Sequence, residues 1–415
     1  MLKALNNFPA LKHKNYKIYL SGQFVSLIGT WMQQLAMSWI VFKLTHSAFW
    51  LGASGFASQI PMFLFGLFAG VIVDHVDRHK LLFWTQSLSA LQAFILAGLT
   101  LTGKINLTEL IILNFTLGLI NCFDITGRQS FVIQMIKNKK DLPNAIALNS
   151  SIVNLTRLIG PAIAGAAIAI VGEGMCFLIN GLSYIAVIIA LYRIKVDKVQ
   201  KRHLNINKII ENIKDGYLST FKNPAIKAVI LFIAFISFFG TPFVNLLPAL
   251  AASLPGGGAH TLGYLSASTG LGSLVGALYL AYRKGPPDLG GIVAFGGLTM
   301  AAFLIVLSRV QLLPYVLVAV FMTGMGMMLQ MSSTNTIIQT LVEDDKRGRV
   351  ISFLTLGLFG TAPFGSLIMG SLAEHFGLRA TFLACGIICF IGAYFFIKKA
   401  NKINSQIIDH VQRLA

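Results

Sequence analysis

Twelve long apolar runs limit what this 415-residue chain can fold into more than any other feature. A helix of about 20 apolar residues crosses a hydrocarbon core of ~30 Å, and lipid offers no water to unpaired backbone groups. The sequence therefore predicts an all-α integral membrane protein with twelve transmembrane helices. The runs begin near Tyr16, Phe49, Leu81, Ile105, Ala145, Met175, Ala225, Leu262, Gly291, Leu312, Arg349 and Arg379.

The composition agrees, since 55% of the residues are hydrophobic and 12% are charged, against roughly a quarter charged in soluble domains. The mixed, basic residues 1–15 have no cleavable-signal pattern. The net charge of +18 is scattered over loops beside membrane ends, so nucleic-acid binding is not expected.

Lys and Arg set the orientation through the positive-inside rule. With a cytoplasmic N-terminus, 28 of the 33 basic residues lie on the inner side, and Arg157 lies within a span. We expect a multi-pass protein of the bacterial inner membrane with both termini cytoplasmic. The four outward residues are Lys43, Lys104, Arg309 and Arg379.

The longest polar interruption divides the chain into two six-span halves. We predict an N-terminal six-helix bundle over residues 1–196, a cytoplasmic linker over 197–223 and a C-terminal six-helix bundle over 224–415. Apolar residues at helical spacing in 205–221 predict an amphipathic helix on the inner membrane face.

The two halves repeat at an offset of 205 residues. At this offset Gln134 falls on Gln339, Gly160 on Gly365 and Gly165 on Gly370. Two halves of the same orientation predict a pseudo-symmetric pair of bundles with a substrate path between them.

The segment GVIVDHVDRHK, residues 70–80, places several ionisable groups directly after an apolar run. It resembles the signature loop of the major facilitator superfamily, with Gly70, Asp74, Arg78 and Lys80 matching and Asp77 standing where Gly is common. Further segments resemble its drug- and siderophore-exporter branch, of the transmembrane secretion effector type that includes enterobactin exporters. These segments are residues 26–48, 123–132, 157–165 and 335–350.

Charges around this loop suggest a conformational latch on the cytoplasmic side. Asp74 ends a helix and needs a nearby cation, which Arg78 can provide. The resemblance implies that Asp124, four residues before Arg128, lies near Arg78, and that Arg349 begins the helix that completes the latch together with Gly70. The alternative is a set of surface charges that fix topology. The second half has Leu280 at the position of the acid.

Arg157 lies about 12 residues into the fifth predicted span, and no acidic residue is predicted at the membrane midplane. A charge at this depth costs on the order of 3 kcal/mol and marks function by default. Its partner is either an anionic substrate or a structural set of carbonyls and amides such as Asn154 and Asn180. If protons drive transport, Asp124, Asp74, Glu109 or the substrate must carry them.

Uncharged polar side chains on the predicted spans that would line a cavity are candidates for substrate binding. The alternative is that they join helices to one another, as polar amides in membranes often do. The Met-rich residues 322–331 fit either an adaptable cavity wall or helix core. Together with Arg157, the predicted substrate-binding residues are Trp31, Gln33, Gln34, Asn121, Asn154, Asn180, Asn245 and Gln330.

No phosphate-binding loop, nucleophile constellation or metal-ligand spacing is present in the sequence. We expect no enzyme activity, cofactor or metal, and a monomer in the lipid bilayer. The favoured function is a secondary transporter that works by alternating access and exports an anionic or amphiphilic small molecule such as a siderophore. Multidrug efflux and import of a ferric siderophore stay open, and a sensor or scaffold is disfavoured because no sizeable soluble domain exists.

Overall fold

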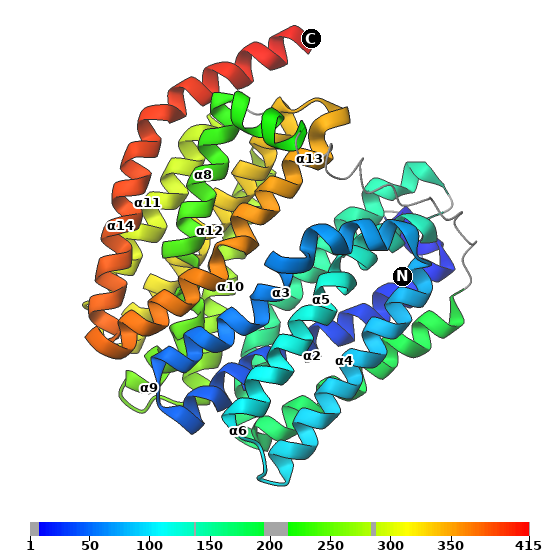
Figure 1. The fold of residues 1–415 in the computed structure, drawn as a ribbon, viewed down its shortest axis with the longest axis vertical. Helices are drawn as coiled ribbons and strands as arrows, with labels where there is room; N and C mark the ends of the chain where they lie inside the picture. The colour runs from blue at the N-terminus through cyan, green and yellow to red at the C-terminus, as the bar shows by residue number, and fades with distance from the viewer. Residues whose placement is uncertain (1–7, 137, 195–214, 284–287, 415) are drawn as a thin grey trace. The chain divides into compact units, whose positions relative to one another are not determined.

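A computed structural model of the chain describes residues 8–136, 138–194, 215–283 and 288–414 (Figure 1). Every regular element in these ranges is a helix, so the predicted all-α fold is confirmed. The helices form two compact units, which are described separately. Unit 1 comprises Met1–Thr45 and Ile60–Leu204, and unit 2 comprises His46–Gln59 and Asn205–Ala415.

Within the described ranges, ten helices are long and apolar enough to cross a membrane. The two longest, α6 (Leu142–Arg193) and α14 (Ala362–Leu414), are each interrupted by a glycine with φ of 81°, Gly172 and Gly377. This backbone conformation is accessible to glycine at little cost. Figure 1 shows the orange and red arms of α14 doubling back on each other. Each arm of α6 and α14 corresponds to one predicted apolar run.

The two interrupting glycines, Gly172 and Gly377, are 205 positions apart. This is the offset of the sequence repeat, so both units turn their chain at the same point of the repeat. The backbone therefore supports the duplication independently of the side-chain matches.

Unit 1 is built mainly on four long helices, and one side chain starts the second of them. Asp77 is the N-cap of α4 and accepts hydrogen bonds from the backbone N–H groups of His79 and Lys80, at 3.0 and 3.2 Å. Asp77, which stands where Gly is common in the signature loop, therefore stabilises the start of α4. The helices are α2 (Lys14–Thr45), α4 (Arg78–Leu101), α5 (Leu107–Met135) and α6, with the part of α3 (Ala48–His75) that follows Gln59.

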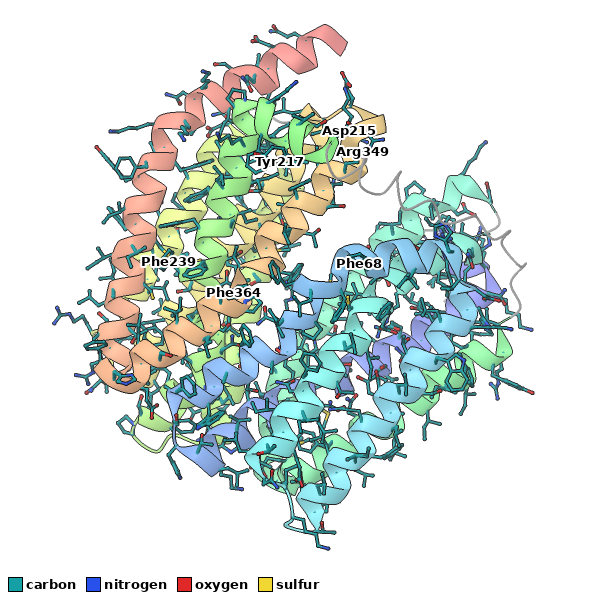
Figure 2. The ribbon with its side chains drawn as sticks, viewed as in Figure 1. Phe68, Asp215, Tyr217, Phe239, Arg349 and Phe364 are labelled. Atoms are coloured by element: carbon teal, nitrogen blue, oxygen red, sulfur yellow. The ribbon has the colours of Figure 1, made fainter. Side chains whose placement is uncertain are left out.

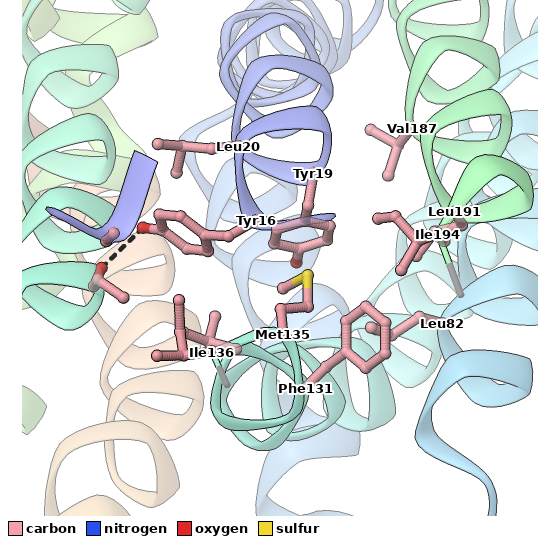
Figure 3. Close-up of a cluster of buried hydrophobic side chains, with 13 residues drawn as sticks. Tyr16, Tyr19, Leu20, Leu82, Phe131, Met135, Ile136, Val187, Leu191 and Ile194 are labelled. Atoms are coloured by element: carbon pink, nitrogen blue, oxygen red, sulfur yellow. Dashed lines mark hydrogen bonds between the residues drawn. The ribbon is translucent and has the colours of Figure 1, made fainter. Parts of the chain in front are cut away.

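A buried aromatic and aliphatic cluster joins one end of these helices (Figure 3). Tyr16 and Tyr19 from α2 lie at its centre, with Phe131 from α5 packed edge-on to Tyr19 at 5.9 Å between ring centroids. The hydroxyl of Tyr16 donates to the carbonyl oxygen of Ala145 at 2.7 Å. The cluster thus buries large rings without leaving that hydroxyl unpaired.

Unit 2 contains two breaks in otherwise apolar helical segments. A 3-10 turn, η3 (Thr241–Leu246), separates α8 (Pro224–Phe239) from α9 (Leu247–Ser253), and a π-helical turn, η4 (Leu356–Gly360), precedes α14. Single π-helical turns occur frequently at functional sites. The remaining helices are α10 (Ala259–Tyr282), α11 (Leu289–Leu307), α12 (Leu313–Leu341) and α13 (Asp344–Thr355).

The first part of α3 belongs to unit 2 because it packs against α14. Glu374 accepts hydrogen bonds from the hydroxyl of Ser47 at 3.0 Å and from the backbone N–H groups of Ala48 and Phe49 at 2.7 and 3.3 Å. Its carboxylate therefore caps the N-terminus of α3, where a negative charge is favourable.

Candidate functional site

Arg157 lies on α6, one turn before Gly160, where the helix approaches α2. A Cβ atom added at Gly160 would lie 2.7 Å from Trp31, so the glycine permits this close approach. The Arg157 side chain is partly exposed. Among the side chains that the structure describes, no carboxylate lies within 4.0 Å of Arg157. Within the described side chains, the charge of Arg157 is therefore not neutralised by an acid, and a charge in a span needs water or an anion.

A chain of buried amides connects four helices of unit 1. The Asn180 amide donates to Gln33 at 2.7 Å, Gln33 donates to Gln92 at 2.8 Å, and Gln92 donates to the carbonyl oxygen of Leu113 at 3.1 Å. Gln33, Gln92 and Asn180 are no more than 2% exposed. The predicted residues Gln33 and Asn180 are therefore used between helices, as polar amides in membranes often are.

The other predicted polar residues of unit 1 have different surroundings. Gln34 is exposed and Asn121 is partly buried, whereas the side chain of Asn154 lies outside the described part of the structure. The adjacent amides of Gln33 and Gln34 therefore have different environments, since Gln33 is buried between helices and Gln34 is exposed. Gln33 and Gln34 can be separated experimentally for this reason.

In unit 2, Asn245 and Gln330 occupy polar positions in apolar surroundings. The Asn245 amide, in the 3-10 turn, donates to the Ser366 hydroxyl at 2.7 Å and lies against Gly55. Gln330 is 2% exposed, and its Nε2 atom has no hydrogen-bond partner among the described residues. An unpaired buried donor of this kind is costly in hydrocarbon and can donate a hydrogen bond to a ligand oxygen.

The acid of the predicted latch that the structure describes best is Asp124. Asp124 is 1% exposed and forms an ion pair with Arg128 one turn along α5. Thr85 and Gln86 from α4 donate to its Oδ1 atom at 2.7 and 2.8 Å. A buried charge pair with further hydrogen bonds is a compensated arrangement, and it ties α4 to α5.

The other predicted latch residues that the structure describes are divided between the two units. A Cβ atom at Gly70 would meet nothing within 4 Å, and the side chain of Asp74 is outside the described residues. In unit 2, Arg349 donates to Asp215 at 2.9 Å, and Figure 2 shows the two side chains next to each other. Asp215 is the first described residue of a helical segment that runs to residue 222, within the predicted linker, so Arg349 holds this segment against α13.

Sequence reasoning missed the partners rather than the polar residues themselves. Gln92 and Thr85 have spacings on α4 that carry no separate signal, and Ser366 lies in an apolar run.

The four cysteines are buried and unpaired. Within the described residues no group of His, Cys, Asp and Glu side chains could hold a metal ion.

Comparison of the sequence with known families and proteins gives a consistent picture. The family described as transmembrane secretion effector matches residues 6–411. The staphyloferrin A transporter of Staphylococcus aureus (strain NCTC 8325 / PS 47) is 29% identical, over 95% of this chain and 99% of that protein. The multidrug efflux pump Tap of Mycolicibacterium fortuitum is 22% identical, over 85% and 88%.

Solved structures share the fold at low sequence identity. A bacterial homolog of the human lysosomal transporter Spinster, inward-facing and unoccupied, has a TM-score of 0.72 with 12% identity, covering 96% of this chain and 98% of that chain. A POT family transporter in complex with 5-aminolevulinic acid has a TM-score of 0.71 with 13% identity, covering 94% and 96%. The chain is a multi-pass membrane transporter rather than an enzyme, and it belongs to the transmembrane secretion effector family of the major facilitator superfamily.

Proposed function

We propose that this transporter exports an anionic small molecule of the siderophore type across the bacterial inner membrane, by alternating access, as a monomer with both termini cytoplasmic. The observation that carries the proposal is Arg157, a charged residue within α6 with no described carboxylate partner. An anionic ligand is the natural neutralising group for such a charge. The staphyloferrin A transporter among its relatives supports the same substrate class.

Besides Arg157, the proposed substrate contacts are polar residues of each unit that the helix contacts leave available. Gln34 is exposed and Asn121 partly buried in unit 1, and Gln330 in unit 2 has an unpaired amide nitrogen. We assign Gln33 and Asn180 mainly to the helix contacts described above, and Trp31, which lies against Gly160, to an apolar wall. Asn154 and Asn245 complete the proposed set.

The first test is thermal stabilisation of the purified full chain by carboxylate siderophores, catecholate siderophores and cationic drugs. A ligand that binds only the folded protein raises its apparent Tm. We expect stabilisation by an anionic siderophore in the wild type, its loss in Arg157→Gln, and its retention in the matched control Arg193→Gln at the exposed end of the same helix. Equal stabilisation of wild type and Arg157→Gln would reject the role of Arg157.

The direction of transport needs its own measurement. Loss of secretion of the siderophore on deletion of the gene supports export. Loss of growth on the iron-loaded siderophore, with secretion intact, supports the alternative of ferric-siderophore import.

Multidrug efflux is the second candidate function, favoured by the relatives named multidrug efflux pump Tap. The methionines of α12 between Met322 and Met331 would supply an adaptable wall. Stabilisation by cationic drugs that is equal in wild type and Arg157→Gln would favour this candidate.

We also propose that Asp74, Arg78, Asp124 and Arg349 control access from the cytoplasmic side. Asp124 and Arg128 provide its buried pair, and protonation of Asp124 or Asp74 is the proposed route of any proton coupling. Glu109 is used in the capping box with Asn106 at the start of α5, which makes it a weaker proton carrier.

The latch predicts that Asp74→Asn raises the cytoplasmic accessibility of a cysteine introduced at Gln34. Asp77→Asn is the matched control because Asp77 caps α4 in the same loop. An unchanged labelling rate in Asp74→Asn would contradict the latch.

A further inference from the structure

An apolar groove with a basic end lies between α8 and α14 within unit 2. Its volume is about 500 Å³. Phe235 and Leu231 from α8 and Phe395 from α14 form its apolar part, and Leu231 and Phe395 are 48% and 60% exposed. A groove of exposed aromatic and aliphatic side chains on a membrane-spanning helix pair suits an acyl chain.

Three lysines line one end of the groove, Lys227 on α8 and Lys399 and Lys402 on α14. All three are exposed, and none of the residues that line the groove is acidic. Neighbouring Lys398 instead lies over the rings of Tyr394 and Phe395, at 5.0 and 5.8 Å from their centroids. The lining lysines therefore concentrate positive charge with no carboxylate of the groove to neutralise it.

Helix length and the distribution of basic residues indicate that the basic end lies at the inner membrane boundary. The arm of α14 after Gly377 continues to Leu414, which at 1.5 Å per residue is roughly 55 Å, against a hydrocarbon core of ~30 Å. About 20 residues after Gly377 suffice for the crossing, so Lys399 and Lys402 emerge at headgroup depth. The positive-inside distribution assigns this end to the cytoplasmic leaflet.

We propose that this groove binds an anionic phospholipid of the inner leaflet, with its phosphate among Lys227, Lys399 and Lys402 and one acyl chain along Leu231, Phe235 and Phe395. Basic pockets between transmembrane helices on the cytoplasmic side are suited to such headgroups. The charge of the lysines selects an anionic headgroup, and the apolar length of the groove selects a lipid over a free phosphate. None of the lining residues is among those proposed to bind the transported substrate.

The test is native mass spectrometry of the delipidated full chain after addition of phosphatidylglycerol or phosphatidylcholine with identical acyl chains. We expect the wild type to retain phosphatidylglycerol in preference to phosphatidylcholine. The amount of bound phosphatidylglycerol should fall at least about fivefold in the triple variant Lys227→Gln, Lys399→Gln, Lys402→Gln, since charge attraction holds the headgroup. The matched control removes the same charge from unit 1, at the exposed residues Lys12, Lys14 and Lys17, and should retain the lipid.

A second variant tests the acyl-chain part without altering charge. Leu231→Trp places a bulky indole ring in the groove at a side chain that is already half exposed, so folding should be preserved. This variant should lose phosphatidylglycerol. In a separate experiment on the wild type, glycerol phosphate added as a soluble competitor should fail to displace the lipid. Equal retention of both lipids by the wild type, or unchanged phosphatidylglycerol in the triple lysine variant, would overturn the site. Unchanged binding in Leu231→Trp would overturn the acyl-chain placement.

Discussion

Unit 1 and unit 2 share the turn of the 205-residue repeat, yet one set of contacts between helices is prominent in each and differs between them. In unit 1, buried polar groups connect neighbouring helices: the Gln33, Gln92 and Asn180 amides, and the Asp124–Arg128 pair with its α4 donors. In unit 2, backbones meet at glycines, since a Cβ atom at Gly272 would lie 1.9 Å from the carbonyl oxygen of Phe321. Both are recognised ways of joining helices in lipid.

The difference teaches which unit can tolerate which change. Polar contacts are directional and leave a buried group unpaired when one member is lost. Close glycine contacts need no partner group but fail when volume is added. The buried polar contacts of unit 1 should therefore be sensitive to loss of a polar group, and the glycine contacts of unit 2 to added volume.

The largest expected effect is in unit 1, at Asp124. Asp124→Ala leaves Arg128 as an uncompensated charge and removes the acceptor of Thr85 and Gln86. Breaking a buried pair in this way costs about 3–5 kcal/mol. The measurement is the free energy of unfolding in mixed detergent micelles.

A double variant separates lost charge pairing from lost volume at the same position. Asp124→Asn with Arg128→Gln removes both charges while an amide oxygen still accepts from α4. It should be less destabilised than Asp124→Ala, because no buried charge is left alone. A double variant at least as unstable as Asp124→Ala would contradict the assignment of an ion pair.

The next effect is in unit 2, at the contact between α10 and α12. Gly272→Ala forces the backbones apart, because the carbonyl oxygen of Phe321 cannot move as a side chain does. Overpacking of this kind costs about 1–3 kcal/mol, read as a lowered Tm.

Gly98 on α4 provides the matched control, since a Cβ atom there meets nothing within 4 Å. Gly98→Ala should leave the Tm unchanged or raise it, because alanine is the better helix former. If both alanine variants have the wild-type Tm, glycine packing is not what holds unit 2.

Much of this architecture follows from the sequence, because apolar runs, charge asymmetry and internal offset are properties of the chain itself. The Asp124–Arg128 pair is compatible with the sequence, since a four-residue spacing places both side chains on one helix face, although the resemblance pointed to Arg78 as the cation near Asp124. The Glu374 cap of α3 does not, because it joins groups 326 positions apart. The predicted runs that begin near Met175 and Arg379 place a turn before each, but the sequence does not show that Gly172 and Gly377 make these turns, because a glycine beside an apolar run gives no sign of its φ.

The candidate site is predictable in part for the same reason. Arg157 is conspicuous as a charge in a span, and that needs no partner to be known. Gln33 and Gln34 are adjacent and chemically identical, so composition and spacing cannot say which one faces another helix. That distinction depends on how α2 is rotated against α4 and α6, which is a property of the packed bundle.

A smaller effect should separate these two glutamines. Gln33→Leu breaks the amide chain and leaves Gln92 and Asn180 each without one partner, which should cost about 0.6–1.7 kcal/mol. Gln34→Leu, the matched control, should leave the Tm unchanged and instead weaken siderophore binding. Loss of stability in both variants would mean that α2 presents both amides to its neighbours.

The smallest expected effect is at the N-cap of α4. There the hydrogen bonds of Asp77 lie within the first turn of one helix and do not join two helices. Asp77→Ala removes the acceptor of the His79 and Lys80 N–H groups, and loss of such a cap costs typically about 1 kcal/mol, less where water replaces it at this exposed position. Asp77→Asn keeps an acceptor oxygen and should restore most of the loss in Tm. If the Tm of Asp77→Asn is lowered as much as that of Asp77→Ala, the negative charge rather than the hydrogen bonds stabilises the helix start. Polar stabilisation of unit 1 would then depend on charge at the loop as it does at Asp124.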